Sequence, residues 1–396
     1  MCDVPALRFP EFTEGWATKS ISDLATVIGG GTPDTTVKSY WNGDIQWFTP
    51  SEIGKNKYVD LSLRTITEEG LNNSSAKLLP PYTILLSSRA TVGECSIALQ
   101  ECATNQGFQS LIAKNCDMDF LYYLIQTKKK ELIRKACGST FLEISANEIR
   151  KIHTYVPSIN EQKKISVLLS LIDKRIATQN KIIEKYESLI QAMCDNLIER
   201  EIQQVTLSFS DFGQSYSGLS GKSAEDFGEG YPFITYMNVY QNQIIDSTDV
   251  GLVKINETEQ QPVVRYGDIL LTLSSETPEE VGMGAVYLGE TYPLYLNSFC
   301  FGIHITDEAK IYPPFLAYYV SSQSFRKAVY PLAQGSTRFN LQKSDFMKKK
   351  FSFPMIEKQR KIYSILKAYS DKLIIEKLIM RLLCKQKCYL LRQLFI

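Results

Sequence analysis

Histidine is scarce in this sequence: only His153 and His304 occur among 396 residues. Neither lies near a serine, cysteine or acidic motif that could complete a nucleophilic triad, so histidine-based hydrolysis is not expected. No apolar run reaches about 18 residues, and residues 1–10 lack a basic region followed by an apolar stretch, so neither a membrane span nor a signal peptide is expected. We therefore expect a cytoplasmic protein without a membrane partner.

Cysteines and glycine-rich loops offer no catalytic or metal site. The nine cysteines are an odd number, and Cys384 and Cys388 lack a nearby second pair that would complete a zinc site. Gly221-Lys222-Ser223 has Tyr216 where a phosphate-binding loop requires glycine, and Gly29-Gly30-Gly31 is better explained as a turn. No Asn-Pro-Pro-aromatic motif of an adenine methyltransferase occurs, and no Glu-x-Lys follows Pro33-Asp34 as in a nuclease. We expect no catalytic residue, no metal ligand and no cofactor in this chain.

The charge distribution is uneven although the formal net charge is only +1. Residues 201–356 hold 11 basic and 17 acidic residues, whereas residues 357–396 hold 10 basic and 3 acidic residues. A protein that binds nucleic acid mainly by charge would be basic throughout. Any DNA contact must therefore depend on local basic groups. The hydrophobic content of 44% is that of a folded protein, and the length suggests two or three domains.

A short pattern occurs twice at a constant separation of 197 residues. Gly138-Ser139-Thr140 recurs as Gly335-Ser336-Thr337, Pro157 as Pro354, Gln162 as Gln359, and Ile165 as Ile362. Weaker matches upstream drift in spacing, as expected for a shared scaffold with divergent loops. The repeat predicts two structurally similar halves.

Each half ends in a predicted long helix with apolar residues at the alternating spacing of a coiled-coil seam. The seam positions are Ile165, Leu169, Ile172, Ile176, Ile183, Tyr186, Ile190, Met193 and Leu197, then Ile362, Leu366, Tyr369, Leu373, Met380, Leu383, Leu390 and Leu394. Gln179 and Glu376 are polar exceptions that could fix the register of an antiparallel pair. The alternative is that each helix only covers its own domain.

The remaining segments mix strand-like and helical patterns. Alternating or apolar runs predict strands near residues 45–49, 83–87, 96–99, 110–113, 233–236, 268–273 and 299–305, and helices over 118–136 and 313–330. The predicted fold is α+β, with mixed domains at 1–157 and 201–354, and helices at 158–200 and 355–396 forming an antiparallel coiled coil. The repeat then gives a pseudo-two-fold arrangement.

The chain resembles the specificity subunit of type I restriction-modification systems. The resemblance rests on residues 4–10 with Trp16, residues 30–41, the helix starts at 157–162 and 354–359, and residues 216–239. One departure is Glu357-Lys358-Gln359, where the family pattern has adjacent Glu and Gln, as in Glu161-Gln162.

That family implies a non-catalytic subunit of a defence system with two target-recognition domains, each reading half of a bipartite double-stranded DNA site. The helices set the spacing and dock two methyltransferase subunits, and restriction-translocase subunits join them. These partners would use S-adenosylmethionine, ATP and Mg²⁺. The alternatives are a DNA methyltransferase or nuclease with its own DNA-reading halves, and a protein scaffold without DNA.

Base recognition needs hydrogen-bonding side chains presented by loops that follow strands. The candidates in the first half are Thr49, Ser51, Lys55, Lys57, Ser87, Ser88, Arg89, Gln106 and Gln109, and those in the second half are Tyr236, Asn238, Gln241, Ser274, Ser275 and Asn297. Phosphate contacts are expected at the two Gly-Ser-Thr triplets and nearby basic residues. These are Ser139, Thr140, Ser336, Thr337, Arg338, Lys343, Lys348, Lys349 and Lys350, with Lys128, Lys129, Lys130, Arg134 and Lys135 in the first half.

Overall fold

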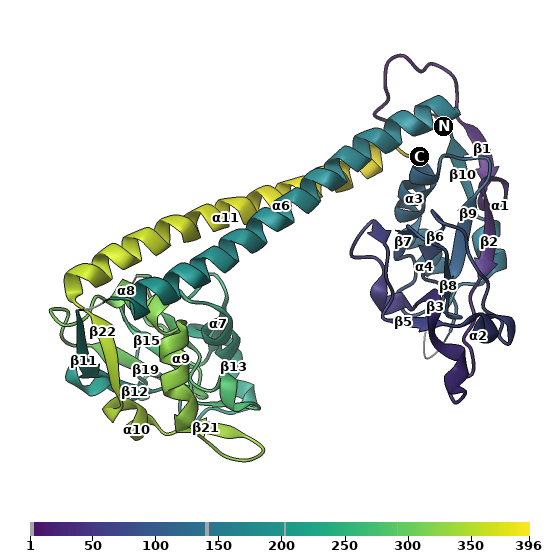
Figure 1. The fold of residues 1–396 in the computed structure, drawn as a ribbon. Helices are drawn as coiled ribbons and strands as arrows, with labels where there is room; N and C mark the ends of the chain where they lie inside the picture. The colour runs from purple at the N-terminus through teal and green to yellow at the C-terminus, as the bar shows by residue number, and fades with distance from the viewer. Residues whose placement is uncertain (1–3, 139–141, 202, 291) are drawn as a thin grey trace. The chain divides into compact units, whose positions relative to one another are not determined.

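The computed structural model describes residues 4–138, 142–201, 203–290 and 292–396, and it divides into two compact units (Figure 1). The first unit comprises Met1–Asn180 and Leu378–Ile396, and the second comprises Lys181–Lys377. Both boundaries fall inside the long helices α6 (Ile159–Glu199) and α11 (Ile356–Gln393). Each unit therefore contains one mixed globular part and a portion of both helices.

The described residues of the globular part of the first unit form three sheets. An antiparallel pair joins β1 (Ala17–Ser20) to β10 (His153–Val156). A five-stranded sheet has the order β2 (Ala25–Gly29), β9 (Gln109–Ala113), β6 (Ile84–Leu86), β7 (Cys95–Ala98) and β4 (Tyr58–Val59). A three-stranded sheet has the order β5 (Arg64–Ile66), β3 (Trp41–Phe48) and β8 (Cys102–Thr104). The short helices are α1 (Ile21–Leu24), α2 (Glu68–Asn72), α3 (Met118–Thr127), α4 (Lys129–Lys135) and α5 (Ala146–Arg150).

The second unit repeats these sheets. The pair is β11 (Gln204–Ser208) with β22 (Lys350–Pro354), followed by the sheet β12 (Gly213–Ser217), β19 (Cys300–Ile305), β15 (Ile269–Thr272), β17 (Gly284–Val286). The third sheet is β14 (Val250–Val253), β13 (Phe227–Ile234), β18 (Tyr295–Leu296), and an additional one is β16 (Ser274–Ser275), β21 (Phe339–Leu341), β20 (Ala333–Gln334). The helices are α7 (Tyr236–Gln241), α8 (Pro313–Tyr319), α9 (Gln323–Val329) and α10 (Lys343–Lys348). The matching strand order confirms the predicted internal repeat.

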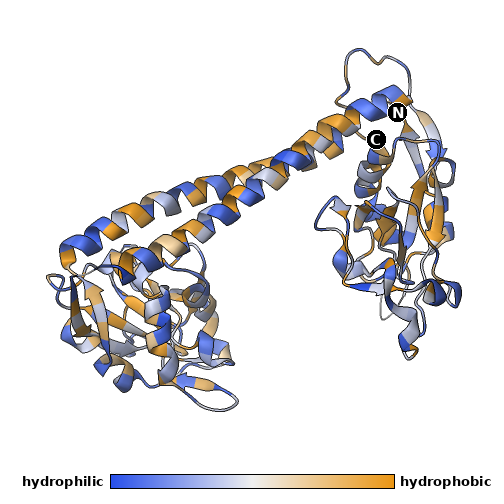
Figure 2. Cartoon of the chain, in the orientation of Figure 1, coloured by the Kyte–Doolittle hydropathy of each residue, from blue (hydrophilic) through white to orange (hydrophobic). Residues whose placement is uncertain are grey.

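The two long helices pack together inside each unit. In the first unit, Ile165 and Leu169 of α6 share a core with Leu394 and Phe395, which follow α11. In the second unit, Cys194 and Ile198 near the end of α6 share a core with Ile362 and Leu366 near the start of α11. The start of one helix therefore meets the end of the other, which confirms the antiparallel pairing. Hydrophobic residues recur along both helices in Figure 2, and none of the predicted seam positions is exposed.

A buried glutamine fixes each long helix to its own globular part. The Gln162 side chain accepts a hydrogen bond from the Asp117 backbone N–H at 2.9 Å and donates one to the Pro157 carbonyl at 2.9 Å. Gln359 makes the same two bonds at 2.8 Å, to the Tyr312 N–H and the Pro354 carbonyl. Because all four backbone groups belong to the globular part that precedes the helix, the repeated glutamine fixes the angle at which each helix leaves its domain.

The departure at Lys358 has a structural explanation. Glu161 is buried, and its carboxylate accepts two hydrogen bonds from Arg8 at 2.8 and 2.9 Å. At the equivalent position 197 residues later, Lys358 forms an ion pair with Glu201 at 3.3 Å. The helix contributes the anion in the first unit and the cation in the second.

Two segments that were each predicted as one continuous helix form two shorter helices. Residues 118–136 form α3 and α4, separated at Lys128, and residues 313–330 form α8 and α9, separated by residues 320–322. In the second case the Ser322 side chain accepts a hydrogen bond from the Phe325 N–H and so starts α9. Serine at such a position favours a new helix start over continuation of the preceding helix. Among the described residues, no helix is long and apolar enough to cross a membrane.

Candidate nucleic-acid interface

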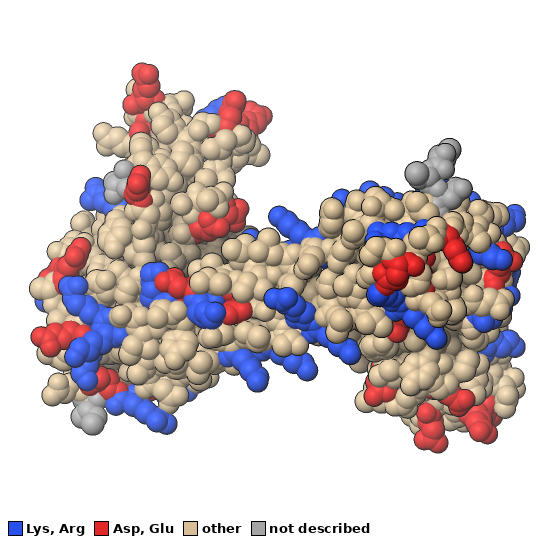
Figure 3. Space-filling model, turned by 90° about the horizontal axis from the view of Figure 1, so that it is seen from above, with Lys and Arg blue, Asp and Glu red and all other residues tan. Residues whose placement is uncertain are grey.

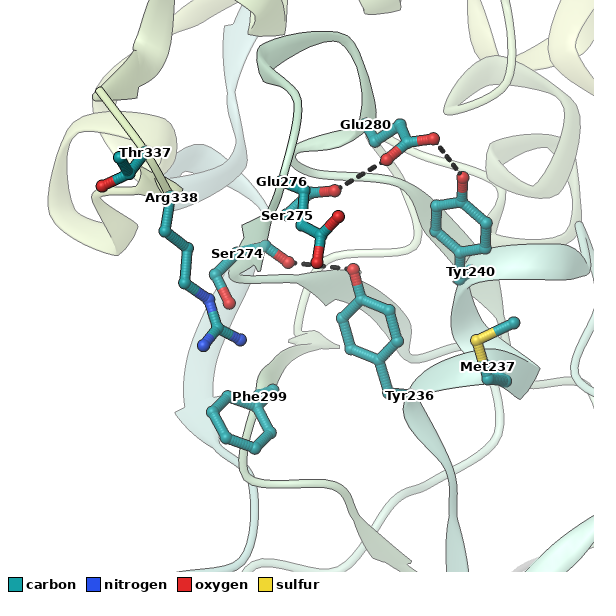
Figure 4. Close-up of a pocket in the computed structure, with 10 residues that line it drawn as sticks. All are labelled: Tyr236, Met237, Tyr240, Ser274, Ser275, Glu276, Glu280, Phe299, Thr337 and Arg338. Carbon is teal, nitrogen blue, oxygen red and sulfur yellow. Dashed lines mark hydrogen bonds between the residues drawn. The ribbon is translucent and has the colours of Figure 1, made fainter. Parts of the chain in front are cut away.

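A pocket of about 500 Å³ opens on the second unit (Figure 4). Helix α7 lines one side of it, and the chain around β16 and the turn before β21 line the others. The lining residues are Tyr236, Met237, Tyr240, Ser274, Ser275, Glu276, Glu280, Phe299, Thr337 and Arg338. Polar, charged and aromatic side chains from separate segments of the chain thus meet at one surface.

Hydrogen bonds hold the α7 side of the pocket. The Tyr236 hydroxyl donates to the Ser274 carbonyl at 2.9 Å. Glu280 accepts from the Tyr240 hydroxyl at 2.7 Å and from the Ser275 hydroxyl at 2.8 Å. These two bonds lower the pKa of Glu280, and the bond to Glu280 raises the pKa of Tyr240. The carboxylate therefore stays charged and ties α7 to β16.

Glycine is required in the turn that carries Thr337 and Arg338. Gly335 has φ of +138°, and a Cβ there would lie 2.1 Å from the Arg338 carbonyl oxygen. Gly138, its counterpart in the first unit, has nearly the same φ of +136°. The repeated glycines therefore adopt the same backbone conformation in both units. Ser336 and Thr337 are exposed on this turn, whereas Ser139 and Thr140 lie outside the described residues.

The pocket brings together several residues predicted from the sequence to contact DNA. They are Tyr236, Ser275, Thr337 and Arg338, and Ser274 also lines the pocket although it is buried. Asn238 is instead buried, and its side chain donates to the carbonyls of Asp246 and Asp249, so the structure removes it from the candidate contacts. Gln241 is exposed on α7, and Asn297 accepts a hydrogen bond from the Phe299 N–H.

In the first unit, the candidates Lys55 and Lys57 line a pocket together with residues of α6 and α11. Ser87 and Ser88 are fully buried, which removes both from the candidate contacts. Lys57 lies inside the unit, 2.6 Å from Asp119, and is also removed. The carbonyl oxygen of the Gln109 side chain is buried as well.

The other candidates of the first unit remain at or near the surface. Thr49 and Ser51 belong to a short turn, where Thr49 bonds to Glu52 at 2.6 Å. Gln106 is exposed and bonds to Thr32. Lys55 and Arg89 are also exposed, and Arg89 lies 3.8 Å from Glu143. These side chains lie at or near the surface, and those of Thr49, Gln106 and Arg89 already have partners within the unit.

Several of the basic residues predicted to contact phosphate already pair with other residues of the protein. Lys350 pairs with Asp211 at 2.9 Å, and Lys343 donates to the Ser217 hydroxyl at 3.1 Å. Lys348 is exposed, and Lys349 is half-buried. In the first unit Lys129 pairs with Glu94, Lys135 with Glu148, and Lys128 is half-buried, whereas Lys130 and Arg134 are exposed. Figure 3 shows basic and acidic side chains interspersed on the globular parts of the face drawn. The structure thus offers local rather than continuous positive charge.

Sequence reasoning missed half of the pocket. Met237, Tyr240, Glu276, Glu280 and Phe299 were not predicted, because only polar residues with donor groups in loops were selected. The sequence signal for Phe299 is its place two residues after the candidate Asn297, and the structure shows that 52% of its surface is exposed.

The two repeats also match a known protein family. Residues 13–188 and 208–382 each match the family model described as the type I restriction modification DNA specificity domain. The chain belongs to this family. Each matched segment contains one mixed globular part and most of the long helix that follows it, so the specificity domain corresponds to the 197-residue repeat.

Individual relatives agree with the family match. The specificity subunit of the type I restriction enzyme MjaIX of Methanocaldococcus jannaschii is 40% identical over 178 residues, which cover 43% of this chain and 41% of that protein. The EcoR124I/EcoR124II specificity subunit of Escherichia coli is 30% identical over 186 residues, 45% of each chain. The matched region thus spans less than half the length of these two relatives. The MjaVIII specificity subunit of M. jannaschii aligns over 93% of this chain and 88% of its own, at 22% identity.

Solved structures share the fold. The S subunit of a type I restriction-modification system from M. genitalium superposes with a TM-score of 0.55 at 17% identity, covering 99% of both chains. A chain from a structure on complex assembly and conformational transition of the type I R-M system gives 0.62 at 14% identity, covering 96% of this chain and 97% of its own. The arrangement of two specificity domains with two long helices therefore belongs to the fold.

Equivalent positions of the two specificity domains carry different side chains. Arg89 forms an antiparallel bridge with Glu143 in the first domain, and Ser274 pairs with Asn340 in the second. Glu143 and Asn340 are 197 residues apart, so Arg89 and Ser274 occupy the same place in the repeat. At this place in the shared scaffold, the first domain has the exposed Arg89 and the second domain has the buried Ser274.

Proposed function

We propose that this protein is the DNA-recognition subunit of a type I restriction-modification enzyme and acts in the cytoplasm. Each specificity domain would read one half of a bipartite double-stranded site, and the paired helices would set the spacing between the halves. The observation that carries this proposal is the double match to the DNA specificity domain on an internal repeat.

The chain would not itself methylate or cleave DNA. The polar side chains of the described pocket bond mainly to one another: Glu280 accepts from the Tyr240 and Ser275 hydroxyls, and the Tyr236 hydroxyl donates to the Ser274 carbonyl. Methylation and cleavage would come from two methyltransferase subunits and from restriction-translocase subunits. Those partners, rather than this chain, would use S-adenosylmethionine, ATP and Mg²⁺.

The long helices offer surfaces for the methyltransferase subunits. In the first unit, Val167 and Leu171 lie one turn apart on α6 and are 59% and 57% exposed. In the second unit, Ile374 and Ile375 on α11 are 64% and 50% exposed. Large apolar side chains left exposed on long helices are typical of a surface that a partner covers. We propose that each pair contacts one methyltransferase subunit.

Methylome sequencing tests the proposal in the source strain with and without this gene. Loss of one methylated bipartite motif on deletion, restored by the intact gene, is the expected result. A methylome that does not change would contradict the proposal. Cross-linking of radiolabelled S-adenosylmethionine to the purified chain alone would favour a methyltransferase with its own DNA-reading halves. Failure of the assembled complex to bind any duplex would favour a scaffold without DNA.

A further inference from the structure

The pocket of the second specificity domain contains two carboxylates where DNA is expected to approach. Glu276 and Glu280 both line it, beside the exposed ring of Phe299. A carboxylate close to the phosphate backbone is repelled by it, so such a residue is costly unless it accepts hydrogen bonds from the DNA. In the major groove the donors are the amino groups of cytosine and adenine. The acidic side chains therefore suggest base reading rather than phosphate binding.

Only one of the two carboxylates is available. Glu280 already accepts hydrogen bonds from the hydroxyls of Tyr240 and Ser275. Glu276 is exposed, and within the described part of the chain its carboxylate has no hydrogen bond or ion pair. Figure 4 shows Glu276 next to Ser275, with its side chain inside the pocket. Glu276 is thus an acceptor without a donor.

Arg338 brings a set of donors to the same pocket. Its guanidinium carbon lies 5.4 Å from the centre of the Phe299 ring, and Figure 4 shows the group pointing into the pocket beside that ring. Among the described residues no carboxylate lies within ion-pair distance of this guanidinium. Contact with an aromatic face holds an arginine in place while leaving its N–H groups free to donate. The sequence analysis grouped Arg338 with the phosphate contacts, but Arg338 lines the same pocket as Glu276, and this favours contact with a base edge.

The two side chains together match one base pair. The major-groove edge of a C·G pair presents the N4 amino donor of cytosine next to the O6 and N7 acceptors of guanine. A glutamate suits the amino group, and an arginine donates to both guanine acceptors at once. An A·T pair has no such pair of acceptors on one base, and it adds a methyl group.

We propose that Glu276 and Arg338 read a C·G base pair in the half-site of the second specificity domain. Glu276 accepts a hydrogen bond from cytosine N4, and Arg338 donates to guanine O6 and N7. The inference rests on the proposed function and adds the identity of one recognised base pair. Glu280 stays bound to Tyr240 and Ser275 and holds the chain that carries Glu276 against α7.

The test uses the complex of this chain with its methyltransferase and the motif found by methylome sequencing. Glu276→Gln should relax the motif at one C·G pair of one half-site, with discrimination at that position falling by ~5- to 150-fold. Arg338→Ala should relax the same position. Glu308→Gln removes an exposed acidic charge of the same unit outside the pocket and should leave the motif unchanged.

Modified DNA gives a second measurement that does not depend on the folding of any variant. 7-Deazaguanine lacks the N7 acceptor, and placing it at each guanine of the motif in turn should weaken binding of the unmodified complex at the same base pair. With Arg338→Ala, that substitution should have no further effect on binding. Thermal unfolding of each variant checks that it is folded.

The outcomes separate the two proposals. If the unmodified complex methylates no bipartite motif, the proposed function fails and this inference fails with it. A bipartite motif that both variants read with unchanged stringency would overturn the inference alone. Equal weakening on every sequence, with no effect of 7-deazaguanine at one position, would also overturn it, since that result describes a phosphate contact.

Discussion

Hydrogen bonds and ion pairs shift the pKa of single side chains, so the stability of this protein should depend on pH. Glu259 is the clearest case. Its carboxylate lies 2.6 Å from the Lys222 ammonium and also accepts hydrogen bonds from the Asn256 N–H at 2.9 Å and the Gln261 amide at 3.0 Å. The bond to Lys222 is the largest of the effects that lower the pKa of Glu259 to about 2. The carboxylate therefore binds its proton less readily in the folded protein than in the unfolded chain.

We expect Glu259→Gln to lower the free energy of unfolding at neutral pH. Because the folded pKa is below the ordinary value of 4.5, the stabilisation is fully present above about pH 4.5 and is lost as the pH falls towards 2. The difference between the variant and the original protein should shrink over that range. Urea unfolding at pH 7, 4.5 and 3 measures it. Glu257→Gln, at an exposed position two residues away, is the control, and equal effects of both changes would refute the assignment.

The buried glutamines at the helix starts give a second prediction at the residue scale. Gln359→Ala would leave the Tyr312 N–H and the Pro354 carbonyl without partners, at a cost of about 1–3 kcal/mol for each group. Gln162→Ala should destabilise the first unit to a similar extent. Gln386→Ala, on the exposed face of α11, is the control and should change stability little. Calorimetry would contradict the role of these glutamines if all three variants unfolded at the same temperature.

At the scale of helices and strands, the sequence predicted what depends on local periodicity. The seam spacing identified α6 and α11, and the constant offset identified the repeat, because each needs only the order of residues along the chain. The division of residues 118–136 and 313–330 into two helices each was missed. Those breaks depend on single capping residues, such as Ser322, whose hydroxyl is equally compatible with a continuous helix in the sequence.

The pocket was only half predictable for a related reason. Tyr236, Ser275 and Arg338 could be selected as donors in loops, but their meeting with Glu276 depends on the pairing of β16 with β21. Asn238 was selected by the same rule and is buried, because residues 246 and 249 fold back over it. Side-chain chemistry can be read from the sequence, whereas exposure depends on contacts between distant segments.

Lysines at the end of helix α10 provide a test of the predicted phosphate contacts. Lys348 and Lys349 have no carboxylate partner among the described residues, whereas Lys350 is paired with Asp211. Replacing Lys348 and Lys349 with Ala should weaken binding to all duplexes. The slope of log K against log salt should fall by about 0.9 for each phosphate that the variant no longer neutralises. Lys367→Ala, whose charge is already paired with Asp371 on α11, is the control. An unchanged slope in the double variant would contradict phosphate binding by α10.

For the molecule as a whole, the equivalence of the two repeats extends to their polar contacts. The Tyr123 hydroxyl bonds to Asp173 of α6 at 2.7 Å, and the Tyr318 hydroxyl bonds to Ser370 of α11 at 2.9 Å. Asp173 and Ser370 are 197 residues apart. A tyrosine thus fixes each globular part to the helix that follows it, with a different acceptor. The two specificity domains thus share these structural contacts although their surface residues differ. The proposed reading of two different half-sites requires such a combination.

A change in the length of the two long helices tests whether they set the spacing between the two half-sites. Inserting seven residues after Gln179 in α6 and seven after Glu376 in α11 keeps the heptad seam in register and lengthens both helices by roughly 10 Å. At about 3.4 Å per base pair, the non-contacted spacer of the bipartite motif should grow by about three base pairs. Both half-sites should remain unchanged, because neither specificity domain is altered.

Methylome sequencing of the strain with the double insertion measures the spacer directly. An insertion in α6 alone is the matched control, since it lengthens one partner of the seam and leaves the other unable to pair along its whole length. It should abolish methylation rather than shift the spacer. If the double insertion supported methylation at the original spacing, the helices would not set the distance between the half-sites, and that part of the proposed function would have to be abandoned.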